Sequence, residues 1–177
     1  MEAEEVFDVV NSCDDVIGTA TRAQVHADGL LHRAVHILVF NSAGELYLQK
    51  RSLEKDTAPG LWDTSAAGHV ETAESYLEAA GRELHEELRL PRNSELTPLF
   101  KLGACIATGH EFIWVYRCFA TTEVIPDPIE VLEGRWCKVE HIDTWMRCRP
   151  FDFTTTFHLI SAQLTEKGEL DKSNGRS

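Results

Sequence analysis

The sequence predicts an α+β fold in which helices cover a mixed β-sheet. Strand-like apolar runs lie on both sides of one strongly periodic helical segment, residues 72–88, and a second helix is expected near the end of the chain. The chain has 177 residues, of which 43% are hydrophobic and 26% charged. This length and composition indicate one globular domain, which we expect to span residues 1–168, followed by a disordered tail at residues 169–177.

The first half of the chain carries strand signals. Two short strands around a polar turn are expected within residues 5–20. Residues 34–50 consist of a nearly continuous apolar run, a turn and an alternating segment, which together are typical of a hairpin. A polar loop is expected at residues 52–60.

Residues 72–88 give the strongest helix prediction. Apolar residues recur there at helical spacings of three and four, namely Leu77, Ala80, Leu84 and Leu88. Three further strands are expected, at residues 99–107, 112–121 and 135–139. Asp152 is expected to cap a last helix, which Gly168 ends.

The chain carries 29 acidic and 17 basic residues, a formal net charge of -12. This balance argues against duplex nucleic acid and anionic membranes as partners, because both are bound mostly through Lys and Arg. No apolar run approaches the roughly 18 residues that span a bilayer. The acidic residues 1–5 are unlike the basic region of a signal peptide.

The five cysteines indicate a reducing compartment. Their number is odd and none forms a C-x-x-C pair, so we expect free thiols and a cytoplasmic protein. Cys105 and Cys118 lie in apolar runs and are expected to be buried. A homodimer is left open as an alternative to a monomer.

Three carboxylates share one side of the helix at residues 72–88. Glu83, Glu86 and Glu87 fall within an arc of roughly 100°, at about 100° of turn per residue, and the apolar stripe lies on a different face. Like charges four residues apart destabilise a helix by roughly a few tenths of a kcal/mol. The face is therefore either a solvated acidic surface or a site for a hard cation, because Mg²⁺ and Mn²⁺ bind oxygen ligands.

The spacing around these glutamates favours the cation site. Seven positions agree with the Nudix signature G-x5-E-x7-R-E-U-x-E-E-x-G-U, in which U is aliphatic: Gly68, Glu74, Arg82, Glu83, Leu84, Glu86 and Glu87. The chain thus resembles the Nudix family in a box at residues 68–90, with Leu90 at the final aliphatic position. Arg89 replaces the last glycine. A non-Gly residue costs roughly 1–2 kcal/mol in a left-handed helix end, so the departure concerns the helix exit and not the ligands.

The resemblance implies an α/β/α sandwich with a divalent-metal site, taking Mg²⁺ or Mn²⁺ as cofactor, for a small-molecule diphosphate. The metal ligands that it implies are Glu83, Glu86, Glu87 and the carbonyl of Gly68. Arg82 looks like the residue that orients the carboxylates, and Glu74 looks structural, near the helix start.

The flanking segments, over roughly residues 6–145, are similar to those of isopentenyl-diphosphate isomerase and its related Nudix hydrolases. On this resemblance Arg22, Arg51 and Lys55 bind diphosphate. Their alternative is an ordinary surface role, but a basic cluster beside a metal site in an acidic chain favours phosphate.

The same resemblance implies a second, histidine-rich metal site. Its members match the isomerase's own metal ligands: His26, His32, His69 and Glu111. The alternative is a set of core histidines with ordinary hydrogen bonds. A second glutamate of the isomerase site falls near Gly109 here and is missing.

Two positions favour hydrolysis over isomerisation. The isomerase has a cysteine where this chain has Ala67, and alanine transfers no proton. Glu83 stands where the isomerase has a second arginine, which restores the hydrolase carboxylate. We therefore expect a hydrolase of a nucleoside-diphosphate-type or related organic diphosphate. The alternatives are an isopentenyl-diphosphate isomerase that uses Glu111, and a module that binds diphosphates without cleaving them.

The general base and the leaving group are left open. One of the helix glutamates, Glu111 or Glu130 is expected to take the proton of the attacking water. Six aromatic residues either contact the leaving group or belong to the core: Phe112, Trp114, Tyr116, Trp145, Phe151 and Phe153.

Overall fold

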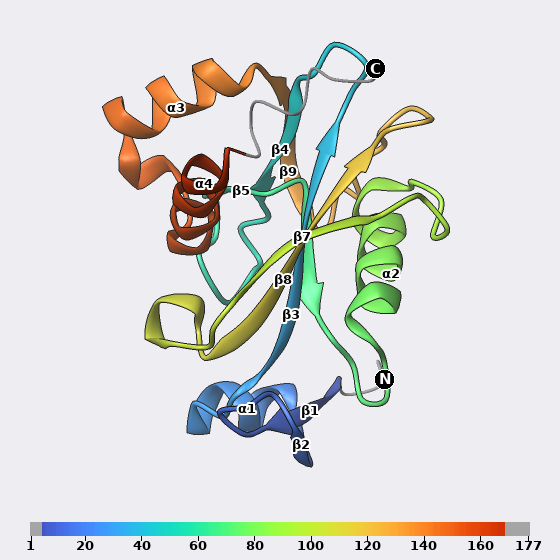
Figure 1. The fold of residues 1–177 in the computed structure, drawn as a ribbon, viewed down its shortest axis with the longest axis vertical. Coiled ribbons are helices and arrows are strands. Elements are labelled where there is room, and N and C mark those ends of the chain that lie inside the picture. Colours follow the sequence, from blue (N-terminus) through green and yellow to red (C-terminus); the bar gives the residue numbers. More distant parts are fainter. Residues whose placement is uncertain (1–4, 169–177) are drawn as a thin grey trace.

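In a computed structural model, residues 5–168 are described, and they form a mixed sheet between helices (Figure 1). The strands are β1 (Val6–Val10), β2 (Val16–Thr21), β3 (His32–Phe40), β4 (Leu46–Arg51), β5 (Trp62–Asp63), β6 (Ala66–His69), β7 (Thr97–Leu102), β8 (Glu111–Phe119) and β9 (Val131–Cys137). The helices are α1 (Arg22–Asp28), α2 (Tyr76–Leu88), α3 (Val139–Cys148) and α4 (Thr155–Lys167), with 3-10 turns at Ile106–Thr108 and Pro150–Asp152.

Strand β3 is the centre of the sheet. It runs parallel to β8, from His32 opposite Glu111 to Phe40 opposite Phe119, and antiparallel to β4 and β6. The strand order is β5-β4-β3-β8-β7, with β6 paired to β3 and β9 paired to β4. Strands β1 and β2 form a separate pair that lies with α1 at one end of the molecule, while α2 covers one face of the main sheet and α3 and α4 the other (Figure 1).

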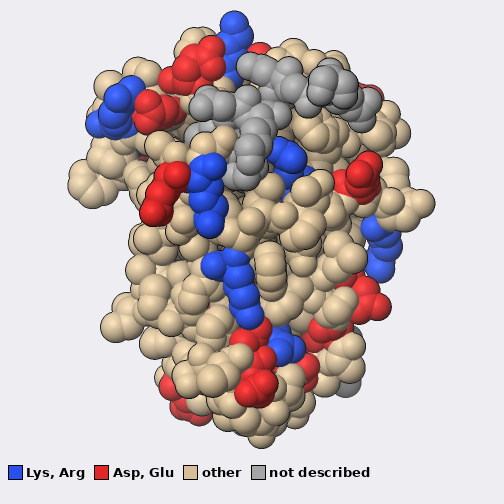
Figure 2. Space-filling model, in the orientation of Figure 1, with Lys and Arg blue, Asp and Glu red and all other residues tan. Residues whose placement is uncertain are grey.

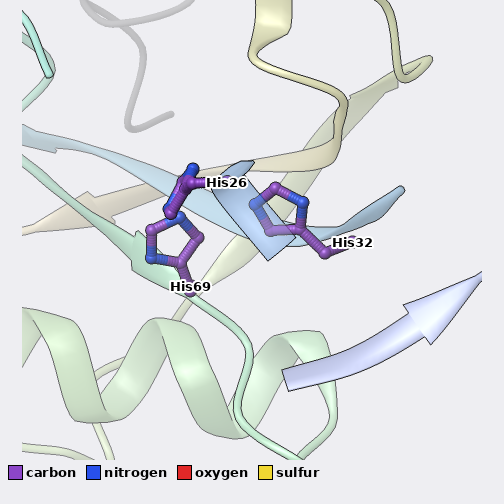
Figure 3. Close-up of side chains that lie close together, drawn as sticks. All are labelled: His26, His32 and His69. Atoms are coloured by element: carbon purple, nitrogen blue, oxygen red, sulfur yellow. The ribbon is translucent and has the colours of Figure 1, made fainter. Parts of the chain in front are cut away.

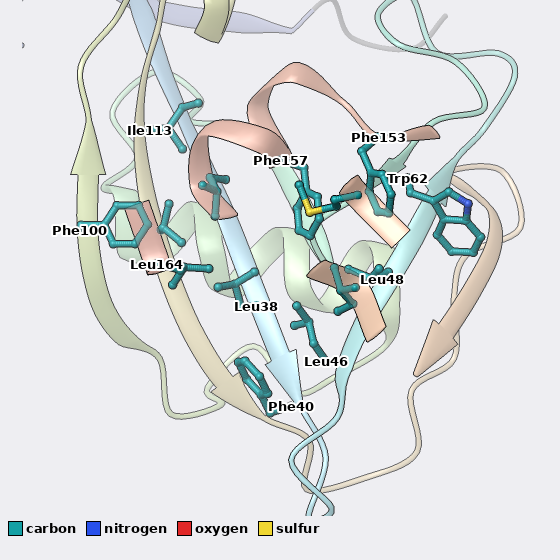
Figure 4. Close-up of a cluster of buried hydrophobic side chains, with 14 of the residues drawn as sticks. Leu38, Phe40, Leu46, Leu48, Trp62, Phe100, Ile113, Phe153, Phe157 and Leu164 are labelled. Atoms are coloured by element: carbon teal, nitrogen blue, oxygen red, sulfur yellow. The ribbon is translucent and has the colours of Figure 1, made fainter. Parts of the chain in front are cut away.

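Alternation along β3 divides its side chains between two cores. Leu38 packs with Phe157 in the core beneath α3 and α4 (Figure 4). Ile37 packs with Leu84 in the core beneath α2. Because successive strand residues point to opposite faces, His36 lies on the side of α4.

The expected sheet covered by helices is confirmed, but helix α2 differs in its start and its buried face. It begins four residues later than expected, because Ser75 caps it in a capping box with Glu78. Leu77 does not belong to the buried stripe, since it is 55% exposed. Ala79 is buried in its place, so the face that meets the sheet is rotated from the predicted one.

Two strand boundaries are also corrected. The strand expected at residues 99–107 starts and ends earlier, as β7, and the chain then turns into the 3-10 helix Ile106–Thr108. The strand expected at residues 135–139 is the end of β9, because Val139 already belongs to α3.

Helices α1 and α3 were not expected at all. Thr154, and not Asp152, caps α4, while Gly168 ends it as predicted, in the left-handed conformation with φ 61°. Cys118 is a buried free thiol as expected, whereas Cys105 is exposed because it lies beyond the end of β7.

The surface charge is mixed on the face drawn in Figure 2, where acidic and basic side chains are interspersed. On that face the net charge of -12 is therefore not gathered into one acidic patch. Within residues 5–168, none of the helices combines the length and the apolar character needed to cross a membrane. The expected tail at residues 169–177 lies outside the described residues.

Candidate functional site

Helix α2 directs the carboxylates of Glu83 and Glu87 toward β6, while Glu86 pairs with Arg82 and Arg92. The side chain of Glu83 is 13% exposed and that of Glu86 is 45% exposed, while Glu87 is buried. Gly68 of β6 lies directly against Glu83, because a Cβ at this position would be 1.9 Å from Glu83 Oε1. The position therefore requires glycine, which lets the carboxylate approach the backbone of the strand.

The electrostatics of this cluster favour a bound cation. Burial and the charge of Glu87 raise the pKa of Glu83 to about 8. Burial also raises the pKa of Glu87 to about 7, although Lys55 and a hydrogen bond from Gln49 oppose the rise. Glu87 Oε2 accepts hydrogen bonds from Gln49 Nε2 at 2.7 Å and from Ala67 N at 3.1 Å. Buried, mutually repelling carboxylate oxygens are a donor set that fits Mg²⁺ or Mn²⁺.

Arg82 joins the carboxylates to the sheet. Its Nε donates to Glu74 at 3.0 Å, and its Nη1 donates to Glu83 at 2.7 Å and to Glu86 at 3.2 Å. Its Nη2 donates to the carbonyl of His69 at 2.9 Å. These contacts are the ones that an orienting role for Arg82 and a structural role for Glu74 require.

Helix α2 ends in the left-handed conformation that favours glycine, although Arg89 occupies this position. Arg89 adopts the left-handed conformation, with φ 58° and ψ 18°, and its N–H donates to the carbonyl of His85 at 3.0 Å. Its guanidinium pairs with Asp127 at 2.5 Å. An arginine therefore occupies the position of the family's glycine without changing the way the chain leaves the helix.

A cavity of about 920 Å³ opens beside the carboxylates. Its lining includes every predicted site residue except Glu74 and His32. Among the described Phe, Tyr and Trp residues, the one that lines this cavity is Phe7. The six aromatic residues considered for leaving-group contact do not, and most of them pack against the two cores: Trp114, Tyr116, Trp145 and Phe153.

The three predicted diphosphate-binding residues face this cavity beside acidic groups. Each of these basic side chains is paired with at least one carboxylate: Arg22 with Glu5 and Asp56, Arg51 with Asp63, and Lys55 with Glu130. The Arg51–Asp63 separation is 3.7 Å. An anionic substrate can replace these partners without leaving a buried positive charge unpaired.

Three histidines converge on the other side of β6 (Figure 3). His26, His32 and His69 come from α1, β3 and β6, and they present ring nitrogens that all lie within 4.8 Å of one another. Glu111, the first residue of β8, accepts a hydrogen bond from His69 Nε2 at 3.1 Å and lies 3.4 Å from His32 Nε2.

His32 shows that a metal ion fits between these groups. Its Nδ1 donates to the carbonyl of Leu30 at 2.9 Å, so Nε2 carries a lone pair. Nε2 is buried and has no hydrogen-bond partner among the described residues. A buried lone pair that faces the Glu111 carboxylate is unfavourable unless Nε2 takes up a proton or a cation lies between the two groups. Three imidazoles and a carboxylate suit Zn²⁺ or Mn²⁺.

Sequence reasoning missed four polar residues of this region: Gln49, His36, Asp63 and Thr64. The period-two pattern of β4 was the available signal for Gln49, because it places that side chain on the α2 face with Tyr47. His36 stood within a continuous apolar run, where a single buried polar residue is itself a signal.

Comparison with known proteins agrees with the signature. The model of the NUDIX domain matches residues 30–157. The chain belongs to the Nudix family. An isopentenyl-diphosphate Delta-isomerase of Burkholderia multivorans is 36% identical over 162 residues, which cover 89% of this chain and 91% of that protein.

Two further relatives extend this comparison. Nudix hydrolase 3 of Arabidopsis thaliana is 41% identical over 115 residues, covering 63% of this chain and 15% of that protein. The crystal structure of DR0079 from Deinococcus radiodurans has a TM-score of 0.71 and 29% identity, covering 82% of this chain and 90% of that one. These findings confirm the Nudix-type sandwich, the likeness to the isomerase branch and an enzyme acting on diphosphate bonds.

Proposed function

We propose that this Nudix protein is a metal-dependent hydrolase of an organic diphosphate. The observation that carries the proposal is one cavity that is lined both by the carboxylates of α2 and by basic side chains. The groups that would hold Mg²⁺ or Mn²⁺ are Glu83, Glu86, Glu87 and the carbonyl of Gly68. The groups that would bind the phosphates are Arg22, Arg51 and Lys55.

The residues of the chain position the reacting groups. When bound, the metal ion lowers the pKa of water and neutralises phosphoryl oxygens. Arg82 holds the carboxylates of Glu83 and Glu86 in place, since it donates to both. Arg51 and Lys55 line the same cavity and would orient the diphosphate for attack by water. One oxygen–phosphorus bond forms to water as the bridging oxygen–phosphorus bond breaks.

Of the two loop and strand candidates for the general base, Glu130 and Glu111, the geometry supports Glu130. It pairs with Lys55, and its charge contributes to the raised pKa of Glu87, so it lies beside the carboxylate cluster. Although burial raises the pKa of Glu111, the His32 ring 3.4 Å away and the hydrogen bond from His69 outweigh burial and hold the pKa well below its usual value. A carboxylate so stabilised in its charged form is a poor proton acceptor.

Isomerisation of isopentenyl diphosphate is the second candidate, because the similar protein of Burkholderia multivorans carries that name and aligns with 89% of this chain. Ala67 lines the cavity where a proton donor is needed, and Gly109 lines it without a side chain. Both positions favour hydrolysis. Non-catalytic diphosphate binding leaves the three repelling carboxylates without a role.

The expected surroundings of the enzyme follow from the same features. Its partner is a small-molecule diphosphate, and neither duplex nucleic acid nor a membrane is needed for the site. Free cysteines throughout residues 5–168 suit a reducing compartment, and we place the protein in the cytoplasm.

The test is hydrolysis of a panel of nucleoside diphosphates, dinucleoside polyphosphates and prenyl diphosphates, with Mg²⁺ or Mn²⁺. It is followed by phosphate release and, for the dinucleoside polyphosphates, by chromatography of the nucleotide products. We expect hydrolysis of at least one organic diphosphate by the wild-type chain and none above background with EDTA. In parallel, proton NMR in deuterated water follows dimethylallyl diphosphate formed from isopentenyl diphosphate. Conversion of that substrate, with no hydrolysis of any compound in the panel, would establish the isomerase instead.

A further inference from the structure

His36 is a buried polar residue that neither metal cluster uses. It lies in the middle of β3, opposite Ala67 of β6, and it lines the cavity from the side of α4. It is 5% exposed, and its neighbours along the same face of β3, Ala34 and Leu38, belong to the apolar core. A polar ring at this place costs stability unless its nitrogens find partners.

The contacts of His36 favour one tautomer of its ring. Nδ1 lies 2.7 Å from Thr64 Oγ1, and the hydroxyl of Thr64 donates to the carbonyl of Ala66 at 3.3 Å. Because the hydroxyl proton is used in this way, the hydroxyl oxygen accepts from Nδ1–H. Asp63 Oδ1, which lies 3.8 Å from Nδ1, also favours a proton there. Nε2 therefore carries the lone pair.

Nε2 is available to a ligand. It makes no hydrogen bond to another described residue, and unlike His32 Nε2 it is not sealed from solvent. Burial lowers the pKa of His36, against the opposing charge of Asp63, so the ring is neutral near pH 7. A neutral ring with Nδ1 protonated presents a single acceptor to the cavity.

The cavity that this acceptor faces has polar side chains as well as the apolar Ala34 and Ala67. Asp63, Thr108 and Thr154 line the same cavity as His36. A hydrocarbon chain placed here would exclude water from Nε2 without satisfying it, and leaving a buried acceptor unpaired is costly. A hydroxyl or N–H group would satisfy it.

We propose that His36 is a specificity-determining residue, whose Nε2 accepts a hydrogen bond from a hydroxyl or N–H donor on the organic part of the diphosphate. The site thereby selects nucleoside diphosphates and other donor-bearing diphosphates against hydrocarbon diphosphates. Asp63 joins this selection to the phosphate end of the site, because it lies beside both His36 and Arg51. The inference rests on the proposed hydrolase function.

A matched pair of variants tests this role. The amide of His36→Asn can keep the contact to Thr64 but places nothing at Nε2, whereas the amide of His36→Gln reaches the place of Nε2. The substrates are the best-hydrolysed member of ADP, GDP, CDP and UDP, and isopentenyl diphosphate as the hydrocarbon probe. Where isopentenyl diphosphate is not turned over, its inhibition constant replaces kcat/KM.

We expect His36→Asn to lower kcat/KM for the nucleoside diphosphate on the order of tenfold, the effect of one lost hydrogen bond. The constant for isopentenyl diphosphate should stay within about twofold, and His36→Gln should recover most of the loss. Equal changes for both substrates, or no change for either, would overturn the role of His36 while leaving hydrolysis intact.

The wild-type chain provides a test that does not depend on folding of the variants. It should bind the nucleoside diphosphate at least about tenfold more tightly than isopentenyl diphosphate at equal Mg²⁺. Equal or tighter binding of isopentenyl diphosphate contradicts the inference. Absence of any hydrolysis of all these compounds and of the wider panel contradicts the proposed function itself, so the two failures are distinct.

Discussion

Two neighbouring residues of β6 belong to chemically different clusters. Gly68 lies against the carboxylate of Glu83 on one side of the strand, and His69 joins the histidine cluster on the other. The first cluster offers only oxygen ligands and the second mainly imidazole nitrogens. A strand that presents successive residues to opposite faces can thus serve two cation sites of different preference.

The two clusters also respond differently to their own charge. In the carboxylate cluster, burial and like charges raise the pKa values of Glu83 and Glu87. In the histidine cluster, the pKa of Glu111 is held below its usual value despite burial, because His32 and His69 stabilise its charge. The carboxylate cluster therefore needs an external cation, whereas Glu111 already accepts a hydrogen bond from His69 and lies beside His32, which can hold a proton or a cation.

The largest expected effect separates the clusters by activity. Glu87→Gln and Glu86→Gln should each lower kcat by on the order of 100-fold, because each removes a metal ligand. Glu111→Gln should lower kcat by less than about tenfold, since hydrolysis is assigned to the other cluster. The measurement is phosphate release at saturating Mg²⁺, with circular dichroism to confirm folding. Near-normal turnover by Glu87→Gln would remove α2 from the site.

The second effect separates the clusters by metal. His26→Ala should weaken Zn²⁺ binding by more than about tenfold, because it removes an imidazole ligand. Glu86→Gln is the matched control and should leave that affinity unchanged within about twofold. Competition with a fluorescent chelator measures both. If His26→Ala and the wild type bind Zn²⁺ equally, the three histidines are core residues and not a metal site.

A third effect concerns stability and pH in the metal-free protein. Glu83 and Glu87 ionise near the ordinary value of 4.5 when unfolded but only near about 8 and about 7 when folded. The folded state thus binds more protons in this interval, so the free energy of unfolding falls as pH rises from about 4.5 through about 8. We expect the Tm to fall by on the order of 5 °C over this range.

The control for this pH effect is Glu87→Gln, which removes one of the two coupled carboxylates. Its Tm should depend less on pH than that of the wild type, and Mg²⁺ should raise the wild-type Tm more at pH 8 than at pH 6. Identical pH dependence of the two metal-free proteins would show that Glu87 is not protonated at neutral pH.

The sequence predicted those features that depend on local pattern. The Nudix spacing placed Glu83, Glu86 and Glu87 beside Gly68, and the structure brings them together. Helix α1 was not predicted, although it has two local signals. These are a capping box, Thr21 with Gln24, and a left-handed glycine at its end.

Other features depend on contacts between distant segments and could not be predicted in this way. Leu77 has helical spacing, yet it is exposed because the packing of α2 on the sheet sets which face is buried. The partner of His36 is Thr64, 28 residues along the chain, and only the antiparallel pairing of β3 with β6 brings their segments together.

The smallest expected effect tests whether strain at the end of α2 belongs to the carboxylate site. Arg89 holds a positive φ of 58°, which is unfavourable for any side chain with a Cβ, and its ion pair with Asp127 is a surface contact. Arg89→Ala keeps the strain and loses the pair. Arg89→Gly loses the pair but relieves the strain, so it should exceed Arg89→Ala in free energy of unfolding by about 1 kcal/mol.

Urea unfolding measures the difference, and phosphate release shows whether kcat stays within about twofold, as expected if Arg89 shapes the helix end alone. A large loss of kcat in Arg89→Gly with unchanged stability would instead make the Arg89–Asp127 pair part of the carboxylate site, because Asp127 N donates to the carbonyl of Glu87 at 2.8 Å.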